Sequence, residues 1–178
     1  MHVSFVGAGP GDPELITVKG QRLLGEADVI IYAGSLVNPA LLSLAKQGAS
    51  IYNSASMTLD QVIEVIEKAT ERGQKTVRLH TGDPSIYGAI QEQMDALDKK
   101  DISYEVIPGV SSFLATAAAL KREYTLPDVS QTVIITRLEG RTPVPEKEKL
   151  ALLGCLDSQY ALSRLYAPEF GHMYRDAK

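Results

Sequence analysis

The sequence Gly7-Ala8-Gly9-Pro10-Gly11-Asp12-Pro13-Glu14 forms a loop rich in glycine and proline, and Thr81-Gly82-Asp83-Pro84-Ser85-Ile86-Tyr87-Gly88 forms a second one. Each loop follows an apolar run that predicts a strand and precedes a run that predicts a helix. Small ligands bind to α/β proteins at the carboxyl ends of strands, where such loops lie. Because both loops carry acidic residues, they favour an unphosphorylated or cationic ligand.

Apolar runs and helical periodicities alternate over the first 120 residues. Strands are expected at 3–6, 28–32, 50–52, 75–80 and 103–107, and helices at 14–25, 38–47, 58–72, 85–97 and 113–120. The helix at 58–72 is the clearest. Its apolar face consists of Val62, Ile63, Val65 and Ile66. Strands that alternate with helices predict an α/β domain with a mostly parallel sheet and helices on both faces.

The composition of the chain changes after this region. Residues 1–120 predict an N-terminal parallel-sheet α/β domain that carries both loops, and the polar segment 121–131 predicts a linker. Residues 132–178 predict the start of a second, incomplete α/β domain, which opens with a strand at 132–136. From about residue 154 the sequence becomes atypical, without strand alternation.

Composition excludes several classes of function. The 178 residues are 44% hydrophobic and 22% charged, and the net charge of −4 disfavours general nucleic-acid binding. Cys155 is the only cysteine, so no disulfide framework or zinc pattern is expected and a reducing cytoplasm fits. His2, His80 and His172 show no metal-ligand spacing. No signal peptide and no membrane span of about 20 apolar residues is expected.

A dinucleotide-binding loop is the first alternative for the opening motif. Gly7 and Gly9 match the Gly-x-Gly-x-x-Gly pattern, but Asp12 stands at its third glycine position. Pro10 removes one backbone donor, and the second predicted strand ends at Tyr32 without the acidic residue that binds ribose. No Gly-Lys-Ser/Thr pattern follows either loop, so the sequence favours a ligand without phosphate.

S-adenosylmethionine has the chemistry that these loops suit, because it carries a sulfonium, an amino group, a carboxylate and an adenosine. Asp83 can accept hydrogen bonds from a ribose or an amino group. Gly82 lets the backbone approach a ligand closely, and Pro84 stiffens the turn. The alternative is an ordinary turn in which Asp83 caps the following helix.

Three motifs in order resemble the tetrapyrrole methylase family. They are Gly-x-Gly-Pro-Gly-Asp-Pro-x-Leu-x-Thr at 7–17, Gly-Asp-Pro-x-x-Tyr-Gly at 82–88 and Pro-Gly-Val-Ser-Ser at 108–112. The segments 32–37, 79–88 and 136–145 are similar to the C11-methyltransferases that act on precorrin-4 or cobalt-precorrin-4 in cobalamin biosynthesis. The resemblance covers residues 1 to about 151.

The resemblance implies two α/β domains with S-adenosyl-L-methionine in the trough between them. It implies a cofactor site formed by Pro10, Thr81, Gly82, Asp83, Ile86, Ser111 and Ser112. For a corrinoid substrate that carries several carboxylates, the candidates are His80, Tyr87, Arg137 and Arg141. The alternatives are a strand cap for His80, packing under the loop for Tyr87, and a surface loop or an inter-subunit pair for the two arginines.

The expected function is therefore S-adenosylmethionine-dependent methyl transfer to C11 by a cytoplasmic homodimer, with no nucleic-acid or membrane partner. In-line transfer to an electron-rich pyrrole carbon requires alignment and exclusion of water rather than a side-chain nucleophile. The alternatives are another ring position, another substrate of the family such as diphthine or ribosomal RNA, and a truncated, non-catalytic remnant, because the family runs further than this chain.

Overall fold

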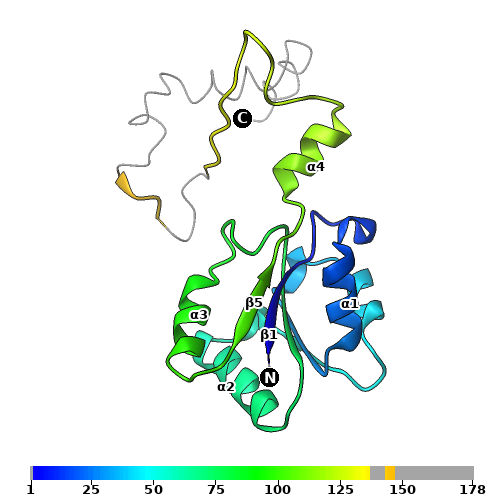
Figure 1. Ribbon diagram of the computed structural model, residues 1–178, viewed down its shortest axis with the longest axis vertical. Helices are drawn as coiled ribbons and strands as arrows, with labels where there is room; N and C mark the ends of the chain where they lie inside the picture. The colour runs from blue at the N-terminus through cyan, green and yellow to red at the C-terminus, as the bar shows by residue number, and fades with distance from the viewer. Residues whose placement is uncertain (1, 137–142, 147–178) are drawn as a thin grey trace. The chain divides into compact units, whose positions relative to one another are not determined.

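The computed structural model describes residues 2–136 and 143–146, and the chain divides into two compact units, Met1–Lys121 and Arg122–Lys178. The first unit contains one five-stranded sheet, in which β1 and β5 lie side by side (Figure 1). The strand order is β3-β2-β4-β1-β5, and every pair is parallel. Its strands are β1 (Val3–Gly7), β2 (Val29–Tyr32), β3 (Ser50–Asn53), β4 (Thr76–His80) and β5 (Tyr104–Ile107). The predicted parallel sheet is confirmed.

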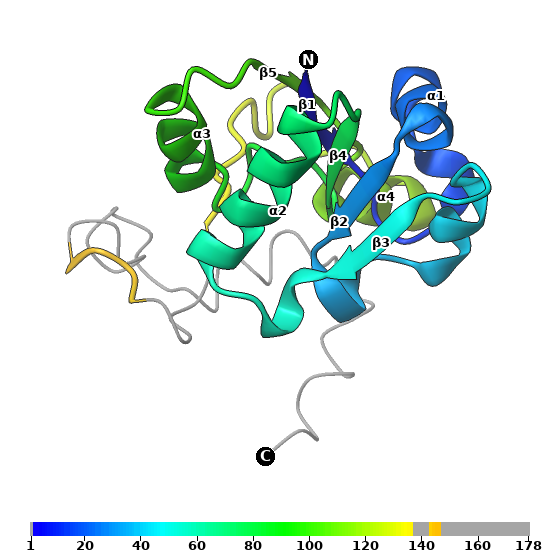
Figure 2. The ribbon, with the colours of Figure 1, turned by 90° about the horizontal axis from the view of Figure 1, so that it is seen from below.

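Helices cover both faces of this sheet, as predicted (Figure 2). On one face, α2 (Leu59–Glu71) and α3 (Gln91–Asp98) enclose a core that includes Phe5 and Ile31. On the other face, α1 (Val18–Glu26) and the 3-10 helix η3 (Pro39–Leu44) enclose a second core around Val6, Ile30 and Leu79. A further helix, α4 (Ser112–Ala119), follows β5. Burial of apolar side chains on both faces is what holds a parallel sheet together.

Helix α2 forms as its sequence predicts. Thr58 caps it in a capping box with Gln61: the Gln61 N–H donates to Thr58 Oγ1 at 3.3 Å, and the Thr58 N–H donates to Gln61 Oε1 at 2.9 Å. Val62, Ile63 and Ile66 of its apolar face are buried, and Val65 packs against them half-buried. The interpretation of this face as core is confirmed.

Two helices predicted in the first 50 residues are shorter than expected. The helix predicted at 14–25 begins as α1 only at Val18, where Thr17 Oγ1 accepts a hydrogen bond from Gly20 N at 3.1 Å. Before it, Asp12 Oδ1 accepts from Glu14 N at 2.9 Å and closes the short 3-10 helix η1 (Pro13–Leu15). The helix predicted at 38–47 is the 3-10 helix η3.

The helix predicted at 85–97 begins as α3 only at Gln91, because the chain before it turns away from helical geometry. Tyr87 and Ala89 have positive φ angles of 57° and 49°, which an α-helix cannot contain. The strand predicted at 132–136 is also wrong. No described strand pairs with it, and Val133, Ile134 and Ile135 are exposed.

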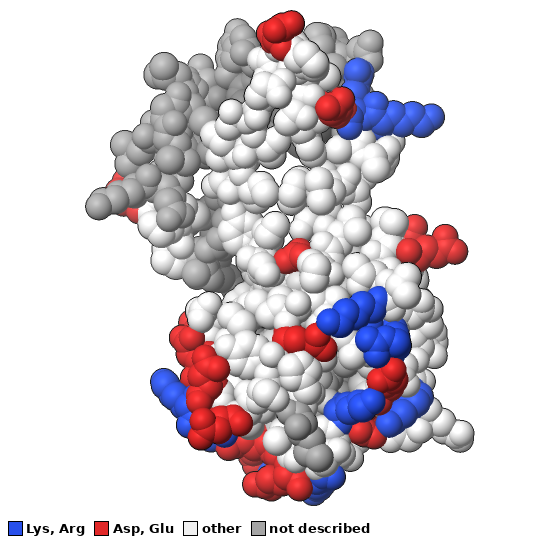
Figure 3. Space-filling model, in the orientation of Figure 1, with Lys and Arg blue, Asp and Glu red and all other residues white. Residues whose placement is uncertain are grey.

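Charged side chains of both signs are mixed over the surface of the first unit, as Figure 3 shows for one face. Several form ion pairs, including Lys19 Nζ with Glu105 Oε2 at 2.5 Å and Lys46 Nζ with Asp28 Oδ1 at 2.6 Å. No helix among the described residues is long and apolar enough to cross a membrane.

Candidate functional site

The two glycine-rich loops are joined to each other by backbone hydrogen bonds. Beyond the ends of β1 and β4, the Ala8 N–H donates to His80 O at 2.7 Å. Gly9 and Gly82 then form an antiparallel bridge, in which Gly82 N donates to Gly9 O at 2.8 Å and Gly9 N donates to Gly82 O at 3.3 Å. The loops therefore form one continuous surface at the carboxyl edge of the sheet, where α/β proteins bind ligands.

A third loop, at Gly109, packs directly against the other two. A Cβ on Gly7 would lie 2.6 Å from Gly109 Cα and 2.6 Å from Gly82 O, and a Cβ on Gly109 would lie 2.1 Å from Gly82 O. No side chain fits at distances this short, so these contacts require glycine. The three loops after β1, β4 and β5 therefore meet backbone to backbone.

Asp83 ties the second loop to the third. Its Oδ1 accepts a hydrogen bond from Ser85 N at 2.8 Å, and its Oδ2 accepts one from Gly109 N at 2.9 Å. The alternative interpretation is therefore right about an ordinary turn at Asp83, whose Oδ1 accepts from Ser85 N, but wrong about a helix cap, because α3 begins only at Gln91. A carboxylate can accept further hydrogen bonds through its remaining lone pairs, so these two contacts leave a ligand-binding role open.

Asn38, a residue that was not predicted from the sequence to belong to the site, holds the first loop in place. Asn38 Nδ2 donates to Gly11 O at 2.7 Å, while Asn38 Oδ1 accepts from Ala40 N at 3.0 Å. An asparagine before Pro39 is a recognisable helix cap, but its second contact is not readable from the sequence. Asp12 shapes the same loop, because its Oδ1 accepts a hydrogen bond from Glu14 N.

His80 lies inside the protein at the end of β4. Its ring is 3% exposed and lies against Phe5, with the ring centroids 6.1 Å apart. Burial, with a smaller effect from the charge of Arg78, lowers the pKa of His80 to about 3, so the ring is neutral at pH 7. It can therefore meet a carboxylate only as a neutral hydrogen-bond donor.

Two buried polar atoms near this strand end lack a hydrogen-bond partner among the described residues. They are His80 Nε2 and, in the next residue, Thr81 Oγ1. Buried polar groups in native proteins are almost always paired, because an unpaired one costs about 1–3 kcal/mol. Both atoms belong to the residues through which β4 enters the second loop.

The start of α4 lies against the second loop. A Cβ on Gly82 would lie 3.6 Å from Ser111 Cα, which places Ser111 at the same edge as Thr81 and Asp83. Ser111 is buried and precedes the first turn of α4, and Ser112 is exposed at its first position. Pro10 and Ile86 are half-buried in their loops. Arg137 and Arg141 lie outside the described residues.

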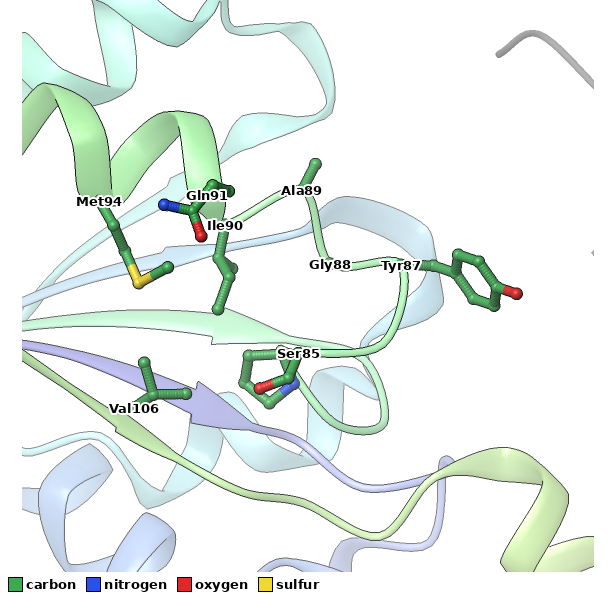
Figure 4. A pocket seen from close by; sticks show the side chains of 9 residues that line it. Ser85, Tyr87, Gly88, Ala89, Ile90, Gln91, Met94 and Val106 are labelled. Atoms are coloured by element: carbon green, nitrogen blue, oxygen red, sulfur yellow. The ribbon is translucent and has the colours of Figure 1, made fainter. Parts of the chain in front are cut away.

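A pocket of about 360 Å³ lies beside the second loop, between α3 and β5 (Figure 4). It is lined by Pro84, Ser85, Tyr87, Gly88, Ala89, Ile90, Gln91, Met94 and Val106. The Tyr87 side chain is 59% exposed, and its ring points away from Met94 and Val106. The alternative that Tyr87 packs under the loop is wrong.

The buried arginine of β4, Arg78, was also not predicted from the sequence to belong to the site. Arg78 is 6% exposed, and its Nε donates to Gln93 Oε1 at 3.0 Å and its Nη1 to Ile31 O at 3.1 Å. Burial lowers its pKa to about 10, so it stays charged at pH 7. The signal available in the sequence was a charged residue at the centre of an otherwise apolar strand.

This architecture is a parallel α/β domain whose strand-end loops meet at glycines, at the edge of the sheet where such domains bind ligands. The chain belongs to the Tetrapyrrole (Corrin/Porphyrin) Methylases, whose family model matches residues 2–165.

Two curated relatives are similar over most of this chain. The cobalt-precorrin-4 C(11)-methyltransferase of Methanocaldococcus jannaschii is 64% identical over 160 residues, which are 90% of this chain and 62% of that protein. The precorrin-4 C(11)-methyltransferase of Pseudomonas aeruginosa is 53% identical over 150 residues, which are 84% of this chain and 60% of that protein. The chain therefore spans about three fifths of the length of these relatives.

Two solved structures are similar as well. An X-ray structure of a cobalt precorrin-4 methyltransferase superposes with a TM-score of 0.82 and 51% identity, over 85% of this chain and 64% of that one. The uroporphyrin-III C-methyl transferase of Thermus thermophilus, complexed with S-adenosyl homocysteine, superposes with a TM-score of 0.56 and 38% identity, over 66% of this chain and 48% of that one.

Proposed function

We propose that this chain takes part in S-adenosylmethionine-dependent methyl transfer to C11 of precorrin-4 or cobalt-precorrin-4, a step of cobalamin biosynthesis. The observation that carries the proposal is the junction of the three strand-end loops at Gly7, Gly82 and Gly109. The names of the two curated relatives, both C(11)-methyltransferases, support the choice of substrate.

The residues at the junction fit the proposed cofactor. The first loop presents backbone around Pro10, which has no N–H to offer a phosphate. The unpaired hydroxyl of Thr81 can bond to a ligand amine, hydroxyl or carboxylate. When bound, S-adenosylmethionine supplies a methyl group on a positively charged sulfur. The residues proposed to hold it are Pro10, Thr81, Gly82, Asp83, Ile86, Ser111 and Ser112.

The part of this chain in the reaction is to position the reactants and exclude water. Backbone held by Gly9–Gly82 pairing and by the two bonds of Asp83 is rigid, and rigid positioning is what in-line displacement needs. The substrate carboxylates require hydrogen-bond donors. We propose Tyr87, the neutral ring of His80, Arg137 and Arg141 for this role.

Calorimetric titration with S-adenosylhomocysteine tests the cofactor site. We expect saturable binding by the natural chain. The variant Gly109→Ala should bind at least tenfold more weakly, about 1.4 kcal/mol, because its Cβ would collide with Gly82 O. Gly25→Ala is the matched control, since a Cβ at Gly25 meets only Leu44 O at an ordinary 3.5 Å. A natural chain that gives no heat at millimolar ligand contradicts the proposal and favours a non-catalytic remnant.

The ring position needs its own test, because the uroporphyrin-III relative is also similar in structure. We expect methylated product from precorrin-4 or cobalt-precorrin-4, with the new carbon at C11 when a ¹³C-labelled methyl donor is followed by NMR. Label on another ring carbon, or on uroporphyrinogen III alone, would assign the chain to a different reaction of the family.

We further propose that the chain is cytoplasmic and forms a homodimer. The single Cys155 fits a reducing compartment. The exposed apolar side chains of Val133, Ile134 and Ile135 favour association, because contiguous apolar surface is costly in water. Light scattering should give the mass of a dimer, and a monomer at micromolar concentration would contradict this.

A further inference from the structure

The segment from Tyr87 to Ala89 has a backbone that is unfavourable by itself. Tyr87 and Ala89 both have φ angles in the left-handed region, at 57° and 49°. Between them, Gly88 approaches Pro84 so closely that a Cβ there would lie 2.0 Å from Pro84 O. Such a conformation persists only where the surrounding structure holds it, and it is often found at binding sites.

Gln93, in the first turn of α3, holds the Tyr87–Ala89 segment in this conformation. Its side chain is buried, and its Nε2 donates to Ala89 O at 3.0 Å. Its Oε1 accepts the hydrogen bond from Arg78 Nε at 3.0 Å. Because Arg78 can only donate, it directs the amide oxygen of Gln93 toward β4 and leaves the amide nitrogen for Ala89.

Arg78 is itself held by neutral partners. Among the described residues it donates hydrogen bonds to the Gln93 side chain and to the Ile31 carbonyl of β2, and no carboxylate pairs with it. A buried cation without a counter-charge is costly, and an apolar side chain would fill the same strand position more favourably. The arginine is therefore better explained by what it orients than by stability.

We propose that Arg78 and Gln93 are positioning residues that hold Tyr87–Ala89 in its left-handed conformation, and that they thereby present Tyr87 and the adjoining pocket to the tetrapyrrole substrate. The second part of this inference rests on the proposed function. The pocket has apolar walls at Pro84, Met94 and Val106 and polar groups at Ser85 and Gln91 (Figure 4). That combination suits a pyrrole ring with carboxylate side chains.

The variant Gln93→Glu separates the two contacts of Gln93. A carboxylate still accepts from Arg78, but it cannot donate to Ala89 O. Gln61→Glu is the matched control, because Gln61 uses its side-chain oxygen as an acceptor from Thr58 N. Gln93→Met is a second variant, which removes both contacts without adding charge.

In the absence of any ligand, the rate of chymotryptic cleavage after Tyr87 reports how firmly the Tyr87–Ala89 segment is held. Cleavage after Tyr52, on the opposite edge strand β3, reports general opening of the domain. We expect Gln93→Glu and Gln93→Met to raise the ratio of the Tyr87 cut to the Tyr52 cut about fivefold, the range of one net hydrogen bond, and Gln61→Glu to leave it within about twofold. An unchanged ratio, or an equal rise of both cuts, overturns the proposal.

Two titrations then connect the loop with the substrate. Uroporphyrin III serves as the tetrapyrrole probe and S-adenosylhomocysteine as the cofactor probe. We expect Gln93→Met to weaken uroporphyrin III binding about fivefold and to leave S-adenosylhomocysteine binding within about twofold. Equal weakening of both indicates a merely structural role and overturns the inference, as does a natural chain that binds no tetrapyrrole. The cleavage ratio could rise in the variants although the natural chain binds no S-adenosylhomocysteine. That result would support the positioning of Tyr87–Ala89 by Gln93 and would contradict the proposed function.

Discussion

Gly9 and Gly82 lie opposite each other and exchange two backbone hydrogen bonds, although they follow different strands. Through this pair, the loop after β1 and the loop after β4 behave as one element. Asp83 extends the same element to Gly109 in the loop after β5. The candidate site therefore depends on contacts between backbones. Substitutions that disturb those contacts should change the free energy of unfolding measurably.

Gly7→Ala should destabilise the first unit. The added Cβ would lie 2.6 Å from Gly109 Cα and Gly82 O, so the three loops must move apart. Overpacking of this kind typically costs about 1–3 kcal/mol, and thermal unfolding should show the loss. Gly25→Ala, a replacement near the end of α1, is expected to leave the free energy of unfolding unchanged or to raise it by up to about 1 kcal/mol. Equal stability of the two variants would contradict the packing described here.

Asp83→Asn should weaken the site, because an asparagine has one acceptor oxygen where the carboxylate uses two. One of the bonds from Ser85 N and Gly109 N must then be lost. We expect a loss of about 1–3 kcal/mol in the free energy of unfolding, measured by urea denaturation. Asp12→Asn is the control, because Asp12 uses one oxygen for Glu14 N and asparagine caps equally well. A loss as large in the control would refute the linking role of Asp83.

His80 should make the protein less stable as the pH falls. Burial lowers its pKa to about 3, below the ordinary value of 6.5, so the unfolded chain binds the proton more readily. The stability it contributes is therefore complete above pH 6.5 and declines as the pH falls from there toward 3. Between pH 7 and pH 5 the free energy of unfolding should decrease by about 2 kcal/mol from this residue.

The variant His80→Gln should reduce that pH dependence. Urea denaturation at pH 5, 6 and 7 gives the comparison. If His80→Gln has the same slope against pH as the natural chain, His80 is not buried in its neutral form.

Glu105 should contribute stability in a lower pH range. The hydrogen bond from Lys19 is the main cause that lowers the pKa of this carboxyl group below 4.5. A lowered carboxyl pKa means that its contribution is present above pH 4.5 and is lost as the pH falls further. Lys19→Met should reduce the loss of stability below pH 4.5, as followed by circular dichroism. An acid transition identical to that of the natural chain would exclude this pair as a contributor.

The parallel sheet and α2 could be predicted from the sequence because their signals are local. Runs rich in apolar and β-branched residues define β1 and β2, and the Thr58 cap with its apolar face defines α2. The loop before α3 could not be predicted in this way. Ile86 and Ile90 continue a helical spacing, but Asp83 and Gln93 hold the intervening backbone from outside the segment.

The same reason explains what was missed in the site. The contacts of Asn38 with Gly11 O and of Arg78 with Gln93 join residues far apart in the chain, and neither residue belongs to a short motif with that role. The strand predicted at 132–136 has the right residue types, but a strand also needs a neighbour to pair with. Residue types alone do not specify that neighbour.

The most direct test of the account is a crystal structure of the protein with S-adenosylhomocysteine. We expect the nucleoside to lie on the joined loops, in contact with Pro10, with Thr81 and Asp83, and with Ser111. A nucleoside bound elsewhere on the protein, or NAD bound to the first loop in a parallel soak, would contradict the claim that the paired loops form the cofactor site.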